Sequence, residues 1–487
     1  MLSYLIDRRR LLCAVAAFSA APALARARDT VDPMAAAFVA AVNDPAARKP
    51  FLAAYASEAG LKASPEAEWI ETFDKVRAAS DGVEFVRFWA GTNASRVRVK
   101  TRRQGLERDL IVRLDRDAPG KLSALALMPR PVQYDPGVTG KPMSREALRD
   151  AIAARVKFAT DRDEFSGAVR VVAPDGQVLF ETAHGVANRD TGTRIALSDR
   201  FHLGSADKSF TALLIGRLID AGKLSLDTRV AEVLPAYANR DAAAKITVRH
   251  LITHSAGLGW LWERKGYDKR KPNTTVTELL PYFWAEAPNF EPGTKSGYSN
   301  EGFVVLGAIV EAVSGESWYD QLAKHVYTPA GMTRSGHFTL DETVPGRAVG
   351  YRYADDDVIG VGERQPNWSF QGWRGNSCGG GYSTVADMTT YLRAMRAGKL
   401  VSATMTDLMT TKAPGGLSDY GMGFQVRAVS GRTTVGHGGG GPGSGIDGDS
   451  WIVKETGWAC SILGNYDAPF VQSLSRDIGT MVAAQEA

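Results

Sequence analysis

The chain has 487 residues, of which 44% are hydrophobic and 23% are charged, and its formal net charge is +4. This composition is ordinary for a soluble globular protein, and the length is sufficient for two or three domains with a sizeable core. A net charge this small on a chain this long gives no reason to expect a nucleic acid or a membrane surface as partner.

The first 27 residues have the features of an export signal. Three arginines at 8–10 precede an apolar stretch at 11–24, and Ala23 and Ala25 form an A-x-A-like cleavage site. The apolar stretch is too short to span a membrane in the mature protein. The arginines followed by two leucines fit a twin-arginine signal, and a Sec signal with a basic end fits equally well. We therefore expect a periplasmic or secreted bacterial protein with no integral membrane segment after cleavage.

Residues 28–128 are predicted to form a small α+β domain. Helical patterns occupy residues 34–79, and four segments of strand length follow them: VEFVRFWA, SRVRVKTR, RDLIVRLD and KLSALAL. Helices followed by a meander resemble, in pattern only, the NTF2-like or cystatin-like domains of some exported hydrolases. The segment contains no catalytic constellation, so we expect it to pack against or shape a site that lies elsewhere.

A Pro- and Gly-rich stretch at 129–143 reads as a linker, and residues 144–487 read as a second domain. This domain begins with the predicted helix SREALRDAIAARVKFA and a predicted hairpin that turns at Asp175-Gly176. Helical stretches follow, the clearest at 211–222 and 301–315. Four strands, GFQVRAV, TTVGHG, DSWIVKE and WACSILGN, precede a final helix. Strands near both ends with helices between them predict one antiparallel sheet flanked by a helical region.

The stretch FHLGSADKSFTALL, at residues 201–214, places a lysine in a helix that is apolar on more than one side. Ser205 can cap this helix, and Lys208, three residues later, is its neighbour on the helix surface. Burial and the positive end of the helix dipole both disfavour an ammonium here, so a neutral amine becomes accessible. Such an amine can take the proton of the serine hydroxyl, and the Ser205 N–H can form half of an oxyanion hole. S-x-x-K alone is a weak signal, because a serine can simply cap and a lysine can reach water.

Five motifs occur in order along the second domain: FHLGSADKSF, LITHSAGLG, SGYSNEGFVVLGAIVEAVSG, GGGYSTVADM and VGHGGGGPG. This series resembles the serine β-lactamase and penicillin-binding superfamily, especially its class C-related branch of D-aminopeptidases, DD-peptidases and carboxylesterases. The resemblance extends over residues 144–487. It implies an α+β, class C β-lactamase-like fold, with an antiparallel sheet flanked by helices, and catalysis through an acyl-enzyme without a cofactor.

The resemblance also implies roles for the second motif, Y-x-N. Tyr298 would share the general-base role with Lys208 and pass a proton to the leaving group, since a phenol beside a cation loses its proton more easily. Asn300 would hydrogen-bond a carbonyl or amide of the substrate. Without Ser205 and Lys208, Tyr298 would read only as a half-buried aromatic residue of a loop.

The third motif of the family is usually K-T-G, and His437-Gly438-Gly439 stands in its place. The resemblance implies that Gly439 lets the substrate lie against the strand and that Gly440 supplies the second N–H of the oxyanion hole. An imidazole is only partly cationic near neutral pH. His437 should therefore hold a substrate carboxylate less firmly than a lysine would, which argues against β-lactam hydrolysis as the main activity.

A second serine, Ser377, also lies in a motif typical of a catalytic nucleophile. Residues 375–379, GNSCG, match the G-x-S-x-G of α/β-hydrolases, and residues 437–440 read HGGG. In that fold the oxyanion motif precedes the nucleophile, whereas here it follows, and no core strand precedes Ser377. Ser205 is therefore the expected nucleophile.

The cysteines, the other histidines and the loop tryptophans show no catalytic or metal-binding pattern. Cys378 and Cys460 can pair, but Cys460 lies in an apolar run that suits a free thiol. His254 is expected to be a buried hydrogen-bonding residue, and no H-x-x-x-H or C-x-x-C spacing indicates a metal. Four tryptophans in loops can either line an acyl pocket or pack in the core: Trp260, Trp262, Trp368 and Trp373.

The sequence thus predicts an exported serine hydrolase acting on a small ester or peptide. Its apparatus serves ester hydrolysis and cleavage of D-amino-acid peptides alike. A penicillin-binding-type module that is acylated and turns over slowly is the alternative. The sequence leaves open the natural substrate, the oligomeric state and the role of the N-terminal domain.

Overall fold

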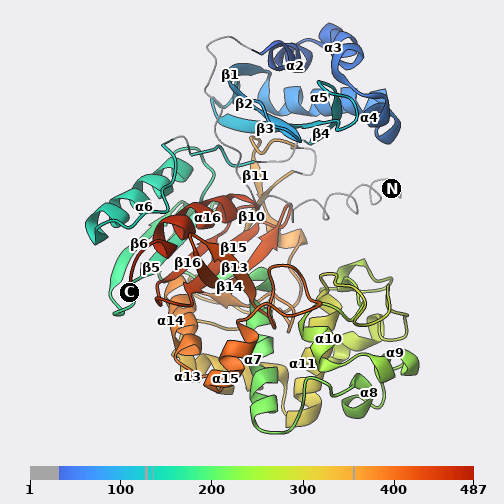
Figure 1. Cartoon of the computed structure of the whole chain (residues 1–487), viewed down its shortest axis with the longest axis vertical. Coiled ribbons are helices and arrows are strands. Elements are labelled where there is room, and N and C mark those ends of the chain that lie inside the picture. The colour runs from blue at the N-terminus through green and yellow to red at the C-terminus, as the bar shows by residue number, and fades with distance from the viewer. Residues whose placement is uncertain (1–31, 127–129, 135, 355–356) are drawn as a thin grey trace. The chain divides into compact units, whose positions relative to one another are not determined.

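The computed structural model describes residues 32–126, 130–134, 136–354 and 357–487. The chain divides into two compact units, one ending at Met128 and the other beginning at Pro129 (Figure 1). The expected export signal, residues 1–27, lies outside the described residues. Within the described ranges, no helix has both the length and the apolar character needed to cross a membrane.

The N-terminal unit is a group of helices followed by a four-stranded antiparallel meander in the order β1-β2-β3-β4. Asp32 caps the first helix, which has Pro33 at its first position, and three helix phenylalanines pack ring to ring in the core. Its elements are α2 (Pro33–Asn43), α3 (Arg48–Tyr55), α4 (Glu58–Ala63), α5 (Glu66–Ser80), β1 (Val83–Trp89), β2 (Ala94–Thr101), β3 (Glu107–Leu114) and β4 (Leu122–Ala126). An α+β unit was expected here.

The second unit is built on a six-stranded antiparallel sheet whose order is β13-β14-β15-β16-β5-β6. The strands are β5 (Gly167–Val172), β6 (Val178–His184), β13 (Gln425–Val429), β14 (Arg432–Gly441), β15 (Ile446–Val453) and β16 (Ala459–Gly464). β16 pairs with β5, so the last strand of the chain closes the sheet against the first hairpin. The predicted sheet assembled from distant segments is confirmed.

Helices cover both faces of this sheet (Figure 1). On one face, α6 (Arg145–Thr160) and α16 (Phe470–Ala483) bury residues such as Ile152 and Leu474 against the strands. On the other face, α7 (Asp207–Asp220) and α14 (Val385–Arg396) join a larger apolar core. Both faces of β15 and β16 are therefore buried, which explains why these strands are almost continuously buried along their length.

A helical region lies beyond α7 and contributes α11 (Asn300–Ser314), whose first eleven residues are all buried. Its other helices are α8 (Val230–Val233), α9 (Arg240–Lys245), α10 (Val248–Ile252) and α12 (Trp318–Leu322), whereas α13 (Thr328–Ala330) packs near α14 and α15 (Ala403–Met409) near α7. Short strands complete the unit: β7 (Val186–Asn188), β8 (Thr193–Arg194), β9 (Phe201–His202), β10 (Tyr351–Tyr353), β11 (Arg364–Pro366) and β12 (Tyr382–Ser383). The predicted α+β architecture, a sheet flanked by helices plus a helical region, is confirmed.

Candidate active site

Ser205 lies in a tight turn, Gly204–Ala206, that leads directly into α7. Gly204 has a φ of +53°, and a Cβ at this position would lie 2.5 Å from the backbone nitrogen of Gly440, so the turn requires glycine. The capping position of α7 is Ala206, with no side-chain capping bond. The expectation that Ser205 caps the helix is therefore wrong, because the helix begins one residue later and the hydroxyl is directed elsewhere.

The amine of Lys208 is fully buried and has three hydrogen-bond acceptors around it. Its Nζ lies 3.1 Å from Ser205 Oγ, 2.6 Å from Asn300 Oδ1 and 2.6 Å from the backbone oxygen of Cys378. α7 supplies the lysine, α11 supplies the asparagine, and a glycine-rich loop at 375–381 supplies the carbonyl. Three segments distant in the sequence thus enclose one side chain.

This arrangement accommodates both protonation states of the lysine. An ammonium has three N–H donors and would use one for each acceptor. A neutral amine has two, which Asn300 Oδ1 and the Cys378 carbonyl take because neither oxygen can donate. The remaining lone pair then faces the Ser205 hydroxyl, which can donate to it. A single proton moving between Ser205 Oγ and Lys208 Nζ therefore converts one bonded state into the other.

Tyr298 lies over the same amine. The centre of its ring is 4.9 Å from Lys208 Nζ, close enough for a cation to interact with the π face. The ring is half-buried, stacks on His254 at 4.4 Å and has Trp260 at 5.7 Å on its other flank. Lys208 and Tyr298, predicted to act together, are brought together.

Asn300 is the first residue of α11 and is 1% exposed. Its Oδ1 accepts from Lys208, so the side chain first of all orients the lysine. Its amide nitrogen remains the group with which it could donate to a substrate carbonyl.

The edge of β14 runs directly against the nucleophile turn. A Cβ on Gly439 would lie 1.9 Å from the Leu203 oxygen and 2.6 Å from the Ser205 nitrogen. Gly440 is exposed, has a φ of +121° and has its nitrogen beside Gly204. The glycines of the third motif allow a close approach of two backbones, with the Gly440 nitrogen beside Gly204 and the Ser205 nitrogen beside Gly439.

His437 is 4% exposed, and both of its ring nitrogens have partners inside the protein. Nδ1 is 2.6 Å from the Gly438 oxygen and Nε2 is 3.0 Å from the Tyr420 hydroxyl, so Nδ1 carries the proton and the tyrosine donates to Nε2. Burial first, then the charge of Lys208, lowers the pKa of His437 to about 3. The expected partial positive charge near neutral pH is therefore absent from this imidazole.

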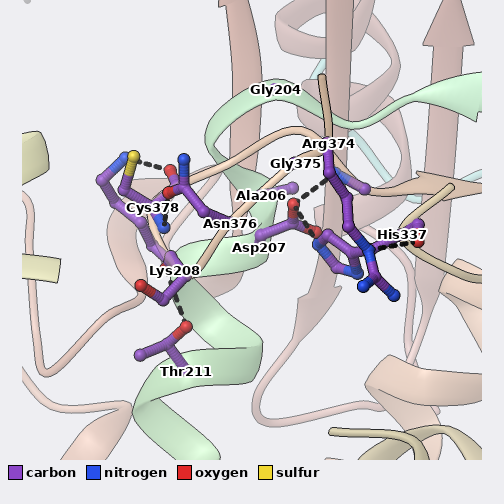
Figure 2. A network of polar contacts seen from close by, with 12 residues as sticks. Gly204, Ala206, Asp207, Lys208, Thr211, His337, Arg374, Gly375, Asn376 and Cys378 are labelled. Carbon is purple, nitrogen blue, oxygen red and sulfur yellow. Dashed lines mark hydrogen bonds and ion pairs between the residues drawn. The ribbon is translucent and has the colours of Figure 1, made fainter. Parts of the chain in front are cut away.

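A buried carboxylate stands immediately before the lysine (Figure 2). Oδ2 of Asp207 accepts from the Gly381 amide at 2.5 Å and from His337 Nε2 at 3.1 Å. Asp207 thereby anchors the loop whose Cys378 carbonyl binds Lys208. Sequence reasoning gave neither Asp207 nor His337 a role in the site, and the signal available was an acid inside the S-x-x-K motif.

Ser377, the alternative nucleophile, is sealed in the core. It is fully buried, and its hydroxyl has no hydrogen-bond partner among the described residues. A Cβ on Gly307 would lie 2.4 Å from its Oγ, so α11 packs directly on it. A carbonyl substrate cannot reach this hydroxyl, in agreement with the choice of Ser205.

The cysteines, the possible metal ligands and the loop tryptophans remain to be placed. Cys378 and Cys460 are both buried free thiols. In the part of the chain that the structure describes, no three His, Cys, Asp or Glu side chains are grouped as metal ligands. Of the four tryptophans, Trp260 lies beside Tyr298, whereas Trp262 and Trp368 are about half exposed.

Comparison with known proteins agrees with this geometry. The family model described as Beta-lactamase matches residues 148–479. The chain belongs to the beta-lactamase family. Penicillin-binding protein 4 of Amycolatopsis lactamdurans is 31% identical over 52% of this chain and 67% of its own length. Esterase EstB of Burkholderia gladioli is 32% identical over 39% and 53%.

A solved penicillin-binding protein from Bacillus halodurans shares the fold of this beta-lactamase family member. The two superpose with a TM-score of 0.58 and 25% identity, over 68% of this chain and 98% of that one. The chain spans between about half and two thirds of the length of the two curated relatives. Members of the family are serine hydrolases, and the resemblance inferred from the five motifs is confirmed.

Proposed function

We propose that this protein is an exported serine hydrolase that cleaves an ester or amide through an acyl-enzyme on Ser205. The observation that carries the proposal is the buried Lys208 amine, 3.1 Å from Ser205 Oγ, with its two other bonding directions occupied by oxygens that cannot donate. In its neutral form, a lysine held in this way directs its lone pair at the serine hydroxyl and can accept its proton.

The reaction proceeds in two balanced steps. Ser205 Oγ forms a bond to the substrate carbonyl carbon while its proton passes to Lys208, and Tyr298 delivers a proton to the departing alcohol or amine. The amides of Ser205 and Gly440 stabilise the negative oxygen that develops. Water, deprotonated by the same pair, then attacks the acyl-enzyme, and the acid leaves as Ser205 regains its proton.

Because His437 is neutral, it has no positive charge with which to bind a substrate carboxylate. This favours substrates that carry no carboxylate next to the scissile bond. Small esters and D-amino-acid amides meet this condition. The second candidate is a D-amino-acid peptidase or DD-carboxypeptidase of cell-wall-type peptides, or a slowly turning-over penicillin-binding module. The penicillin-binding relative and the penicillin-binding neighbour support this second reading.

We also propose the division of the chain that its sequence indicates. Residues 1–27 are the export signal, 28–128 the small α+β domain, 129–143 the linker and 144–487 the hydrolase domain. The small domain is assigned a packing or substrate-shaping role.

A chromogenic panel tests the activity: nitrophenyl esters, D-amino-acid anilides and a β-lactam, each with wild type and Ser205→Ala. We expect turnover of esters or amino-acid anilides that falls by at least about 10³-fold in the variant. A stoichiometric adduct without turnover would instead support the slow module. Activity surviving in Ser205→Ala would refute the assignment of the nucleophile.

A further inference from the structure

His254 holds Tyr298 from three directions. Its backbone oxygen accepts from the Gly297 amide at 2.9 Å, and its ring Nδ1 accepts from the Ser299 amide at 3.1 Å. Between these two bonds its ring stacks on the Tyr298 ring, with centroids 4.4 Å apart and planes at 29°. One residue thus contacts Gly297, Tyr298 and Ser299, three consecutive residues that include the first two of the Y-x-N motif.

The backbone of His254 adopts a conformation that a side chain rarely favours. Its φ is +61°, in the left-handed region, although the residue is not glycine. Such conformations persist where the surroundings over-determine them, and they cluster at functional sites. Here the conformation directs the carbonyl and the ring of His254 towards the same loop.

The ring of His254 is neutral and has a defined tautomer. It is 1% exposed, and burial, followed by the nearby Lys208 and His437, holds its pKa well below the usual value. Because Nδ1 accepts a hydrogen bond, the proton is on Nε2, and this buried atom has no partner among the described residues. This tautomer is the one in which Nδ1 can accept the hydrogen bond from the Ser299 amide.

His254 also connects Tyr298 to the third motif. The Tyr420 ring packs 4.8 Å from it, and the Tyr420 hydroxyl bonds His437 Nε2. The ring of Phe303, on α11, also packs against it, with centroids 5.1 Å apart. The ring is enclosed by aromatic groups, so that its orientation, and with it the plane of Tyr298, is restricted.

We propose that His254 is a positioning residue that holds the Tyr298 phenol over the Lys208 amine, through one hydrogen bond on each side of Tyr298 and a ring stack between them. The inference rests on the proposed function, since it assigns His254 to the proton-transfer step of that site. The lysine-to-ring distance of 4.9 Å is what His254 maintains.

His254→Asn is the variant of choice. Asparagine tolerates the left-handed conformation and offers an oxygen to the Ser299 amide. The variant therefore removes the stacked ring but keeps the backbone conformation and both hydrogen bonds. We expect kcat to fall by about 10–100-fold with KM changed by less than about threefold, because a misplaced catalytic group costs rate and not binding. The probe is p-nitrophenyl butyrate, and the rate at which a fluorophosphonate labels Ser205, followed by intact mass, is the second measurement.

The decisive comparison is made in the Tyr298→Phe background. Phenylalanine keeps the ring and loses the hydroxyl, so nothing remains for His254 to position. His254→Asn should then cause no further loss, giving a non-additive cycle. Equal loss in both backgrounds, or an unchanged kcat in the single variant, would overturn the proposal.

Val310→Ala controls for lost stability. Val310 is fully buried in α11, ten residues beyond the asparagine of the site, and its truncation destabilises the same helical region. We expect it to lower the melting temperature while kcat stays within about twofold. If Ser205→Ala leaves activity intact, the proposed function fails. If Ser205→Ala abolishes it while His254→Asn does not reduce it, only the positioning role fails.

Discussion

At the scale of single residues, buried polar atoms distinguish the two serines of the chain. Ser205 Oγ bonds a buried amine, whereas Ser377 Oγ is buried without a partner among the described residues. A hydroxyl without a base beside it remains a poor nucleophile. Reactivity is therefore a property of the neighbours. The neighbour of Ser205 is Lys208 on α7, which α11 and the loop at 375–381 hold in place.

Asp447 is a second buried group whose charge depends on its surroundings. It lies on β15, opposite Gly440, and accepts from the Val471 amide at the start of α16 at 2.7 Å. Burial raises the pKa of Asp447 to about 8, although hydrogen bonds from Val471 and Gln472 lower it and the nearby Asp449 and Asp467 add to the rise. The folded protein therefore retains this proton where an unfolded chain would lose it.

Asp447→Asn should stabilise the protein in mildly alkaline solution. Because the folded pKa lies above the unfolded value near 4, the contribution of Asp447 to stability falls as pH rises from about 4 to about 8. Asparagine mimics the protonated acid, so we expect the variant to match wild type near pH 4.5 and to exceed it by about 1–3 kcal/mol at pH 8. Urea unfolding at both pH values measures the difference. Parallel pH dependences of the two proteins would contradict this.

At the scale of elements, β14 and the nucleophile turn meet backbone to backbone. Gly439 is the contact point, since a Cβ there would lie 1.9 Å from the Leu203 oxygen. Backbone atoms cannot rotate away as a side chain can, so one of the two elements would have to move. The position of the strand relative to the turn decides whether the Ser205 and Gly440 amides can act together as the proposed oxyanion hole.

Gly439→Ala should therefore separate the strand from the turn. We expect kcat to fall by about 10²-fold or more, the cost of losing an oxyanion donor, and stability to fall by about 1–3 kcal/mol from overpacking. Gly441→Ala on the same strand is the matched control, because a Cβ there meets nothing within 4 Å. Steady-state kinetics and thermal unfolding compare the pair. Similar behaviour of both alanine variants would show that close packing is not what matters.

At the scale of the whole molecule, each unit has its own hydrophobic core. Phe38, Phe51 and Phe73 are buried in the first unit, and the second is built around its six-stranded sheet. Units that bury separate cores commonly unfold separately. The site residues named above all belong to the second unit.

Calorimetry should consequently show two unfolding transitions of unequal enthalpy. A boronic acid that forms a reversible adduct with Ser205 should raise the midpoint temperature of the larger transition alone. At 100 times its dissociation constant, it should add about 2.7 kcal/mol to the free energy of unfolding of the second unit. The smaller transition, from the first unit, should not move. One transition that shifts as a whole would contradict independent units.

Local patterns were sufficient for the elements and for the pairing of Ser205 with Lys208. The hairpin with its turn at Asp175-Gly176 and the helical run of TALLIGRLIDAG predicted β6 and α7, because turn chemistry and period are short-range properties. A spacing of three residues at a helix start makes two side chains neighbours whatever surrounds them. The five motifs in order then indicated the family.

The charge states and the remaining partners were decided by the tertiary structure alone. Lys208 acquires its other acceptors from Asn300 and Cys378, 92 and 170 residues away. His437 is neutral because the fold buries it against Tyr420, which no pattern around HGGG indicates. Periodicity specifies which face of an element is buried, but desolvation and hydrogen bonding depend on which distant element covers that face.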